Sequence, residues 1–175
     1  MSKEFTYAKA GVDRDLRARS KESLRRLTTT YKYSRYGKVI KLPYGNIFPF
    51  GDSYLDFVIE GVGSKVLLAQ LADKYDTIGV DAVALAVNDV IRSGAKPLAI
   101  VDNIHAQVSN PRLVDEWIKG IMKGASEAEC LVPAGEIGDV AEVIKGLIEG
   151  KGFDMIVASI GEVAEEDIVY SNTIK

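Results

Sequence analysis

Residues 54–75, YLDFVIEGVGSKVLLAQLADKY, place a β-rich run, a glycine-rich turn and an apolar run in direct succession. Residues 54–59 alternate poorly between polar and apolar side chains, which suits a strand covered on both faces. The hexapeptide EGVGSK (60–65) then predicts a turn. The apolar run after it predicts a helix. This strand–turn–helix unit favours a fold in which strands alternate with helices.

The next segment predicts a buried helix. Residues 80–94, VDAVALAVNDVIRSG, are apolar nearly all round the helical period. Gly94 is placed to end this helix, and Pro97 follows it. Further strands are predicted at 39–42, 98–102, 131–136 and 153–163, and further helices at 16–27, capped by Asp13, and from Pro111, with Leu113, Trp117 and Ile121 along one face. The sequence therefore predicts an α+β (α/β-like) fold.

Composition narrows the class of protein. The chain has 175 residues, 47% of them apolar and 27% charged, which suits one domain or slightly more. The single cysteine, Cys130, excludes a disulfide framework within one chain and is expected to be a buried small hydrophobe. There is no apolar run of membrane-spanning length and no signal-peptide pattern at the start, so we expect a cytoplasmic protein.

Charge is distributed unevenly. Residues 1–41 carry twelve basic and four acidic residues, a net +8, whereas the remainder carries −11. A basic leader could contact nucleic acid, an anionic small molecule or the acidic face of a partner. Because no zinc-knuckle or RNA-binding aromatic signature accompanies it, we favour a solvated basic face and expect no nucleic-acid partner.

The EGVGSK turn is the first candidate for chemistry. Gly61 and Gly63 would let the backbone approach a ligand closely, and the helix that follows would supply free N–H groups. Ser64 and Lys65 add polar donors, which completes the parts of a phosphate cradle. The GxxxxGK[ST] spacing of a Walker A motif is absent. A plain glycine-rich turn is the alternative reading.

Acidic residues supply the second candidate. Asp89, with Asn88 beside it, falls within an apolar helix, where a carboxylate must meet a metal, a cation or backbone donors. Glu136 follows a predicted strand, and Asp52 and Asp102 fall at predicted strand ends or loops. Carboxylates that converge from separate elements suit Mg²⁺, which prefers oxygen ligands and often bridges to nucleotide phosphates. Hydrogen-bonded or solvated acids are the alternative.

His105 is the only histidine. One histidine cannot form a zinc site, and no serine or cysteine stands out as a nucleophile for it to activate. General acid–base work is possible. A structural or surface histidine is the interpretation we favour.

Taken together, these segments resemble the N-terminal part of the phosphoribosylformylglycinamidine cyclo-ligases of purine biosynthesis. The matching blocks, in order, are YAKAGVD (7–13), EGVGSK (60–65, usually DGVGTK), DTIGVD (76–81), ALAVND (84–89), GAKPL (94–98) and GE (135–136). Their order and spacing cover most of the chain. The wider superfamily includes selenophosphate synthetase, thiamine-monophosphate kinase and a hydrogenase maturation factor.

The resemblance implies a four-stranded mixed sheet with flanking helices that pairs across a homodimer into a β-barrel, with ATP near the interface. It implies a basic N-terminal segment (1–36), an ATP-binding domain (37–164) and a linker (165–175). The implied reaction is the ATP- and Mg²⁺-dependent closure of formylglycinamidine ribonucleotide to aminoimidazole ribonucleotide. The implied site residues are Lys65 and Asp89 for catalysis, Gly61, Gly63, Ser64, Lys65 and Asn88 for ATP, and Glu60, Asp89, Glu136 and Asp52 for Mg²⁺.

The sequence departs from the family pattern at three positions. Glu60 replaces an Asp, Ala134 a Gly, and Ile137 the Thr after Glu136. Family members also carry a second α/β domain, so we expect an isolated N-terminal domain that lacks part of the active site and turns over no substrate alone. Two alternatives stay open: another ATP-using member of the superfamily, such as a small-molecule kinase or hydrogenase maturation factor, or an inactive dimerisation module.

Overall fold

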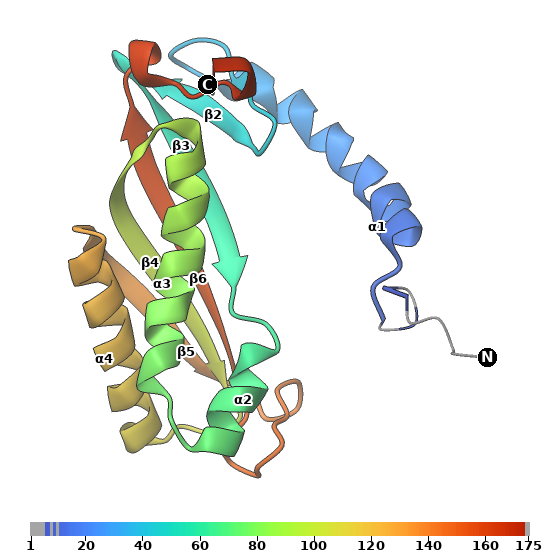
Figure 1. Ribbon diagram of the computed structural model, residues 1–175, viewed down its shortest axis with the longest axis vertical. Helices are drawn as coiled ribbons and strands as arrows, with labels where there is room; N and C mark the ends of the chain where they lie inside the picture. Colours follow the sequence, from blue (N-terminus) through green and yellow to red (C-terminus); the bar gives the residue numbers. More distant parts are fainter. Residues whose placement is uncertain (1–5, 8, 10, 174–175) are drawn as a thin grey trace.

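The computed structural model describes residues 6–7, 9 and 11–173; Ala8 and Ala10 of the opening motif and residues 174–175 of the predicted linker lie outside the described residues. The predicted α+β class is confirmed, with a mixed sheet and flanking helices (Figure 1). The strands are β1 Ile40–Lys41, β2 Asn46–Phe50, β3 Ser53–Gly61, β4 Lys96–Ala106, β5 Leu131–Asp139 and β6 Phe153–Val163. The helices are α1 Arg14–Lys21, α2 Lys65–Ala72, α3 Asp76–Val90 and α4 Pro111–Glu127, with 3₁₀ segments η1 Glu22–Tyr33, η2 Ile91–Ser93, η3 Glu165–Asp167 and η4 Ser171–Thr173.

The sheet has six strands in the order β1-β2-β3-β6-β4-β5, so the expectation of four strands was wrong. Much of the difference lies in β2, where Pro49 and the flanking glycines predict a turn. A proline cannot donate to a strand ladder. Because β1 pairs only with Asn46 and Ile47, Pro49 needs no N–H on that side, and β2 pairs through residues 47–50 with β3.

The other edge of the sheet is β5. It pairs parallel with β4, whereas the remaining neighbours are antiparallel. Pro133 falls at the register shift between the pairs Ala99–Leu131 and Val101–Ala134, the kind of position where a strand tolerates proline.

Helices α3 and α4 cover one face of the sheet (Figure 1). The predicted face of α4 is confirmed, because Leu113, Trp117 and Ile121 are all buried. Trp117 packs on Phe153 of β6 with ring centroids 4.8 Å apart. Close approach of α3 and α4 requires glycine, since a Cβ on Gly120 would overlap the backbone of α3.

The opposite face of the sheet is open, and it carries an apolar patch on β3, β6 and β4. Phe57 and Ile59 of β3 are 60% and 68% exposed, and Val101 of β4 is 37% exposed. The register aligns Phe57 with Ile160 and Ile59 with Ala158, so these side chains share one face. An apolar sheet face of this kind needs a cover.

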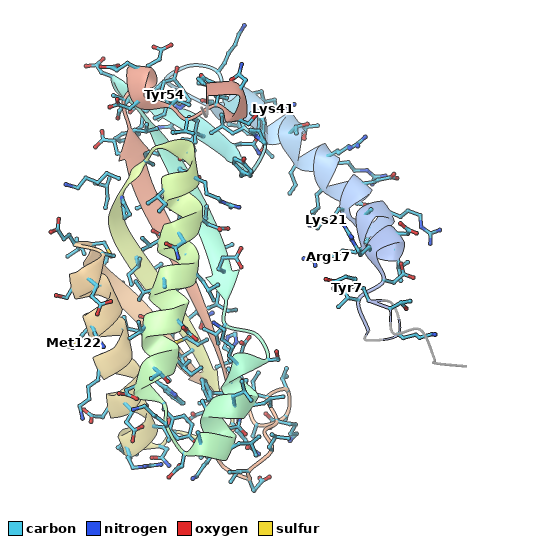
Figure 2. The ribbon with its side chains drawn as sticks, viewed as in Figure 1. Tyr7, Arg17, Lys21, Lys41, Tyr54 and Met122 are labelled. Atoms are coloured by element: carbon cyan, nitrogen blue, oxygen red, sulfur yellow. The ribbon has the colours of Figure 1, made fainter. Side chains whose placement is uncertain are left out.

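The N-terminal arm, residues 12–36, extends away from the sheet over most of its length (Figure 1), and its end contacts β2, where the Tyr36 and Phe50 ring centroids are 5.2 Å apart. Asp13 caps α1 as predicted, its Oδ1 accepting from the N–H of Leu16 at 2.9 Å, but the helix continues as 3₁₀ after Lys21. No residue of α1 or η1 is buried, and Figure 2 shows Arg17 and Lys21 on the arm, away from the sheet. Within the described part of the chain, no helix is both long and apolar enough to cross a membrane.

Candidate functional site

The EGVGSK turn joins the end of β3 to the start of α2. Val62 is buried and its N–H donates to the Met155 carbonyl at 3.0 Å, which anchors the turn to β6. Gly63 has φ +61°, and nothing lies within 4 Å of the place where its Cβ would be. Ser64 makes no side-chain cap hydrogen bond, so no hydroxyl closes the start of α2. The turn therefore presents a helix start with open space before it, as an anion site requires.

Lys65, the first residue of α2, is held by a partner that the sequence reading did not assign to the site. Its Nζ lies 2.9 Å from Oδ2 of Asp81 on α3, and both side chains are close to half exposed. In the sequence, Asp81 is part of the DTIGVD block. Nothing local marks it, because the contact joins two helices that tertiary packing brings together.

Two carboxylates share the helix-covered face beside the turn. Glu60 pairs with Val157 and Val157 with Asp102, so the two acids lie in one row, two strands apart. Asp102 is 8% exposed, and burial raises the pKa of its carboxyl. Gly135 makes room for it, since a Cβ there would lie 2.5 Å from Asp102 Oδ2.

Glu136 lies on the other face of the sheet. It pairs with Asn103, which pairs with Ile156, and Ile156 pairs with Gly61 at the end of β3. Asn103 Oδ1 is buried without a hydrogen-bond partner. In the next row on this face, His105 pairs with Asp154. The end of β3 is therefore in register with Asp102 on one face of the sheet and with Asn103 and Glu136 on the other, two or three strands away.

Asp89 lies near the opposite end of α3. Its Oδ2 is 2.7 Å from Nη2 of Arg92, and its side chain is 28% exposed. It follows Asp81 by eight residues, about 12 Å along the helix axis. Asn88 is exposed. The Asp89 carboxylate is paired with a cation, as the sequence predicts, and that cation is Arg92, three residues along the chain.

Asp52 lies in the turn between β2 and β3, exposed and a whole strand away from Glu60. The four predicted Mg²⁺ ligands thus occupy a turn, a strand end, a helix end and the open face. Within residues 6–7, 9 and 11–173, no three Asp, Glu, His or Cys side chains form a group that could hold a metal ion. Mg²⁺ often takes one or two carboxylates and completes its shell with phosphate oxygens and water. Of the four predicted ligands, Glu60 is the one that adjoins the turn.

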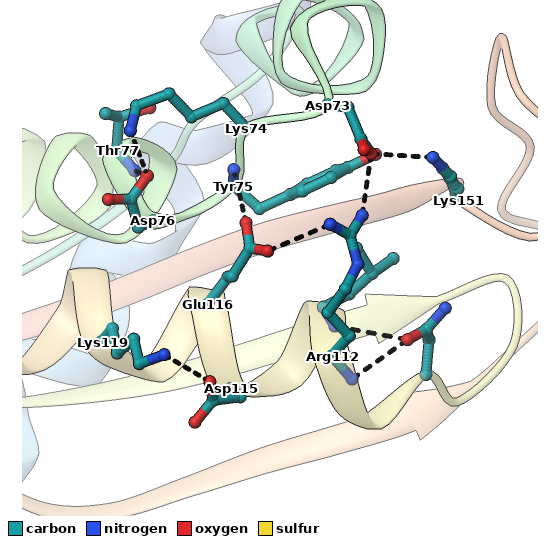
Figure 3. A network of polar contacts seen from close by, with 12 residues as sticks. Asp73, Lys74, Tyr75, Asp76, Thr77, Arg112, Asp115, Glu116, Lys119 and Lys151 are labelled. Carbon is teal, nitrogen blue, oxygen red and sulfur yellow. Dashed lines mark hydrogen bonds and ion pairs between the residues drawn. The ribbon is translucent and has the colours of Figure 1, made fainter.

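A polar network fixes the α2–α3 connection to α4 (Figure 3). Asp73, at φ 47°, pairs with Arg112 at 2.8 Å and with Lys151 at 2.7 Å. Hydrogen bonds from Lys151 and Arg112 lower the pKa of the Asp73 carboxyl. Glu116 pairs with Arg112 and accepts from the N–H of Tyr75. The network holds the start of α3, the helix that carries Asp81.

Cys130 is half-buried against the main core, and burial raises the pKa of its thiol. A raised pKa keeps the thiol protonated and unreactive at neutral pH. This agrees with its predicted role as a small hydrophobe.

The fold is an α+β domain in which a glycine-rich turn leads into a helix start with open space before it. Residues 46–163 match the family described as AIR synthase related protein, N-terminal domain. The phosphoribosylformylglycinamidine cyclo-ligase of Pyrococcus furiosus is 33% identical over 178 aligned positions, which cover 98% of this chain and 51% of that protein. The chloroplastic/mitochondrial cyclo-ligase of Vigna unguiculata is 33% identical over 99% of this chain and 41% of its own.

Solved structures agree on the fold. AaThiL, complexed with AMPPCP and TMP, has a TM-score of 0.58 at 15% identity, over 74% of this chain and 38% of that one. The hydrogenase maturation protein HypE, in complex with ATP, has a TM-score of 0.53 at 15% identity, over 83% and 38%. The chain belongs to the AIR synthase related family, as the resemblance implied, and it spans about half the length of the curated relatives it matches.

Proposed function

We propose that this chain is the N-terminal half of an ATP-dependent cyclo-ligase that converts formylglycinamidine ribonucleotide to aminoimidazole ribonucleotide, with release of ADP and phosphate. The observation that carries the proposal is the match to cyclo-ligases over 98% of the chain. The open helix start at residues 60–65 supports the ATP part of it, because that turn has the backbone geometry of a phosphate site.

In this proposal the formyl oxygen attacks the γ-phosphorus of ATP and ADP departs. The neighbouring nitrogen then attacks the activated carbon, and phosphate leaves. The tasks of the protein are to position the reactants and to neutralise phosphate charge. Gly61, Gly63 and Ser64 would offer backbone N–H groups, and Lys65 would offer its ammonium, which Asp81 orients until nucleotide arrives.

Mg²⁺ belongs to the proposal as the counter-ion of the ATP phosphates. The dispersed carboxylates do not make a cage for it, so the phosphate oxygens would supply most of its ligands. Glu60 is the protein ligand we favour. It keeps a carboxylate at the position where the family usually has Asp, with a side chain one methylene longer.

We also propose a homodimer in which the open face of β3, β6 and β4 packs on the same face of a second copy. Exposure of Phe57 and Ile59 supports it, since a monomer would leave these side chains in water. Residues 165–175 would act as a linker to a second domain, which the relatives' greater length supports.

Nucleotide binding tests the ATP site. Titration of the chain with the ATP analogue AMPPNP in Mg²⁺ is expected to show binding that Lys65→Met weakens about tenfold, the loss of one charge-assisted contact. Lys123→Met is the matched control, because Lys123 is an exposed lysine on α4 whose nearest carboxylate is 3.9 Å away. Equal affinity in all three proteins would overturn the assignment of the turn. Turnover of the cyclo-ligase substrate is expected only when the chain is joined to a second domain, and binding without any such activity would favour a superfamily kinase or an inactive module.

A further inference from the structure

A small polar cluster lies at the far end of α3, away from the glycine turn. Arg92 of η2 pairs with Asp89, and its guanidinium lies over the Tyr44 ring at 5.3 Å from the centroid. Its Nε also donates to the Asp89 carbonyl at 3.3 Å. Arg92 is therefore held by a carboxylate, a carbonyl and a ring, a geometry that suits the planar guanidinium.

A second carboxylate faces the same cluster. Asp56 of β3 is 6% exposed and lines the same cavity as Asp89 and Arg92. Burial raises the pKa of the Asp56 carboxyl, the Ser93 hydroxyl and the Arg92 guanidinium act to lower it, and the Asp89 carboxylate raises it further. Asp56 therefore adjoins the ion pair between Asp89 and Arg92.

The enclosed cavity at the cluster is small. The cavity has a volume of about 10 Å³ and is lined by Leu42, Tyr44, Gly45, Asp56, Val58, Asp89, Arg92 and Ser93. That volume holds about one water molecule. Mg²⁺ requires an octahedral shell and usually keeps several waters, so a hydrated ion does not fit inside this cavity while Arg92 lines it.

We infer that the Arg92 guanidinium is the resident cation of the Asp89 carboxylate, and that Asp89 does not ligate Mg²⁺ in this protein. Arg92 acts as a positioning residue that joins the end of α3 to the β1–β2 turn through Tyr44. The inference rests on the proposed function in one respect: it concerns which carboxylate binds the Mg²⁺ that accompanies ATP, and it excludes Asp89.

The test measures Mn²⁺ binding without nucleotide. Free Mn²⁺ is monitored by its electron paramagnetic resonance signal, and the melting temperature is measured with and without Mn²⁺. Because no nucleotide is present, failure of the ATP site at residues 60–65 would not affect the result. As a single substitution, Asp89→Asn is expected to leave Mn²⁺ binding the same as in the wild type. Arg92→Gln is expected to lower the melting temperature and to raise the affinity for Mn²⁺ about tenfold over the wild type, since the Asp89 carboxylate loses its counter-ion.

The affinity gained by Arg92→Gln is expected to disappear in the double variant Arg92→Gln/Asp89→Asn. Arg25→Gln, on the exposed arm, is the matched control and should change neither quantity. Loss of wild-type Mn²⁺ binding on Asp89→Asn would overturn the inference. So would an Arg92→Gln protein that keeps its stability and gains no affinity for Mn²⁺. If Arg92→Gln does not fold, the affinities of the wild type and Asp89→Asn for Mn²⁺ in the presence of AMPPNP decide: equal affinities support the inference, and a weaker affinity in Asp89→Asn overturns it.

Discussion

The contact between α3 and α4 sets the position of Asp81 and depends on Gly120, where the two helix backbones approach closely. A Cβ on Gly120 would overlap the Asp76 carbonyl oxygen and lie 2.8 Å from the Gly79 Cα. These neighbours are backbone atoms, so the helices would have to separate. Alanine gains about 1 kcal/mol of helix propensity over glycine. Overpacking against rigid backbone costs more, and we expect Gly120→Ala to destabilise the fold by about 3 kcal/mol.

A loss of that size lowers the melting temperature by roughly 6–12 °C for a chain of this length. Gly124→Ala should cost less, because its Cβ would meet the Val83 side chain, with the nearest atom 2.8 Å away. Gly138→Ala is the control, since only His105 Cδ2 lies near, at 3.9 Å. Melting curves and urea titrations of the three variants measure the series. An unchanged or higher stability for Gly120→Ala would refute the close helix contact.

Three further outcomes are expected. Burial raises the pKa of the Asp102 carboxyl, so the protonated carboxyl contributes stability at pH values below its unfolded pKa of 3.8, and this stability is lost as the pH rises through the folded pKa. Asp102→Asn should therefore raise the melting temperature by roughly 2–4 °C at pH 7 and leave it unchanged at pH 3. Equal shifts at both pH values would contradict that cause. Gln70→Ala should cost about 2 kcal/mol in urea titrations and speed protease cleavage of residues 140–152, because the buried Gln70 Oε1 accepts from the N–H groups of Leu147 and Ile148; an unaltered cleavage rate would argue against it. Phe57→Glu should convert a dimer to a monomer in sedimentation at micromolar concentration, and a wild type that sediments as a monomer would rule out the paired face.

Local patterns were sufficient for much of the fold. The four-residue steps of Leu113, Trp117 and Ile121 after Pro111 predict α4 and its buried face, because that period is helical and proline suits a first turn. Gly94, at φ 89°, ends the α3–η2 segment as its sequence position indicates. Strand β2 was missed, because whether Pro49 is tolerated depends on how far its neighbour β1 extends, which local sequence does not encode.

Part of the candidate site is likewise predictable from local sequence and part is not. The EGVGSK turn was predictable, since glycine spacing and a following helix are local features. Asp81 was not, because its contact with Lys65 spans sixteen residues and two helices. Arg92 was within reach of the sequence, since an arginine three residues after Asp89 shares its helix face.

Backbone amide shifts show whether the 60–65 turn binds the phosphates of ATP. Titration of ¹⁵N-labelled protein with AMPPNP and Mg²⁺ should shift the amide signals of Gly61, Gly63, Ser64 and Lys65 first and most strongly. Asp89 should move little, because its partner is Arg92. Shifts centred on Asp89 or Asp52 with the 60–65 amides unmoved would contradict the account.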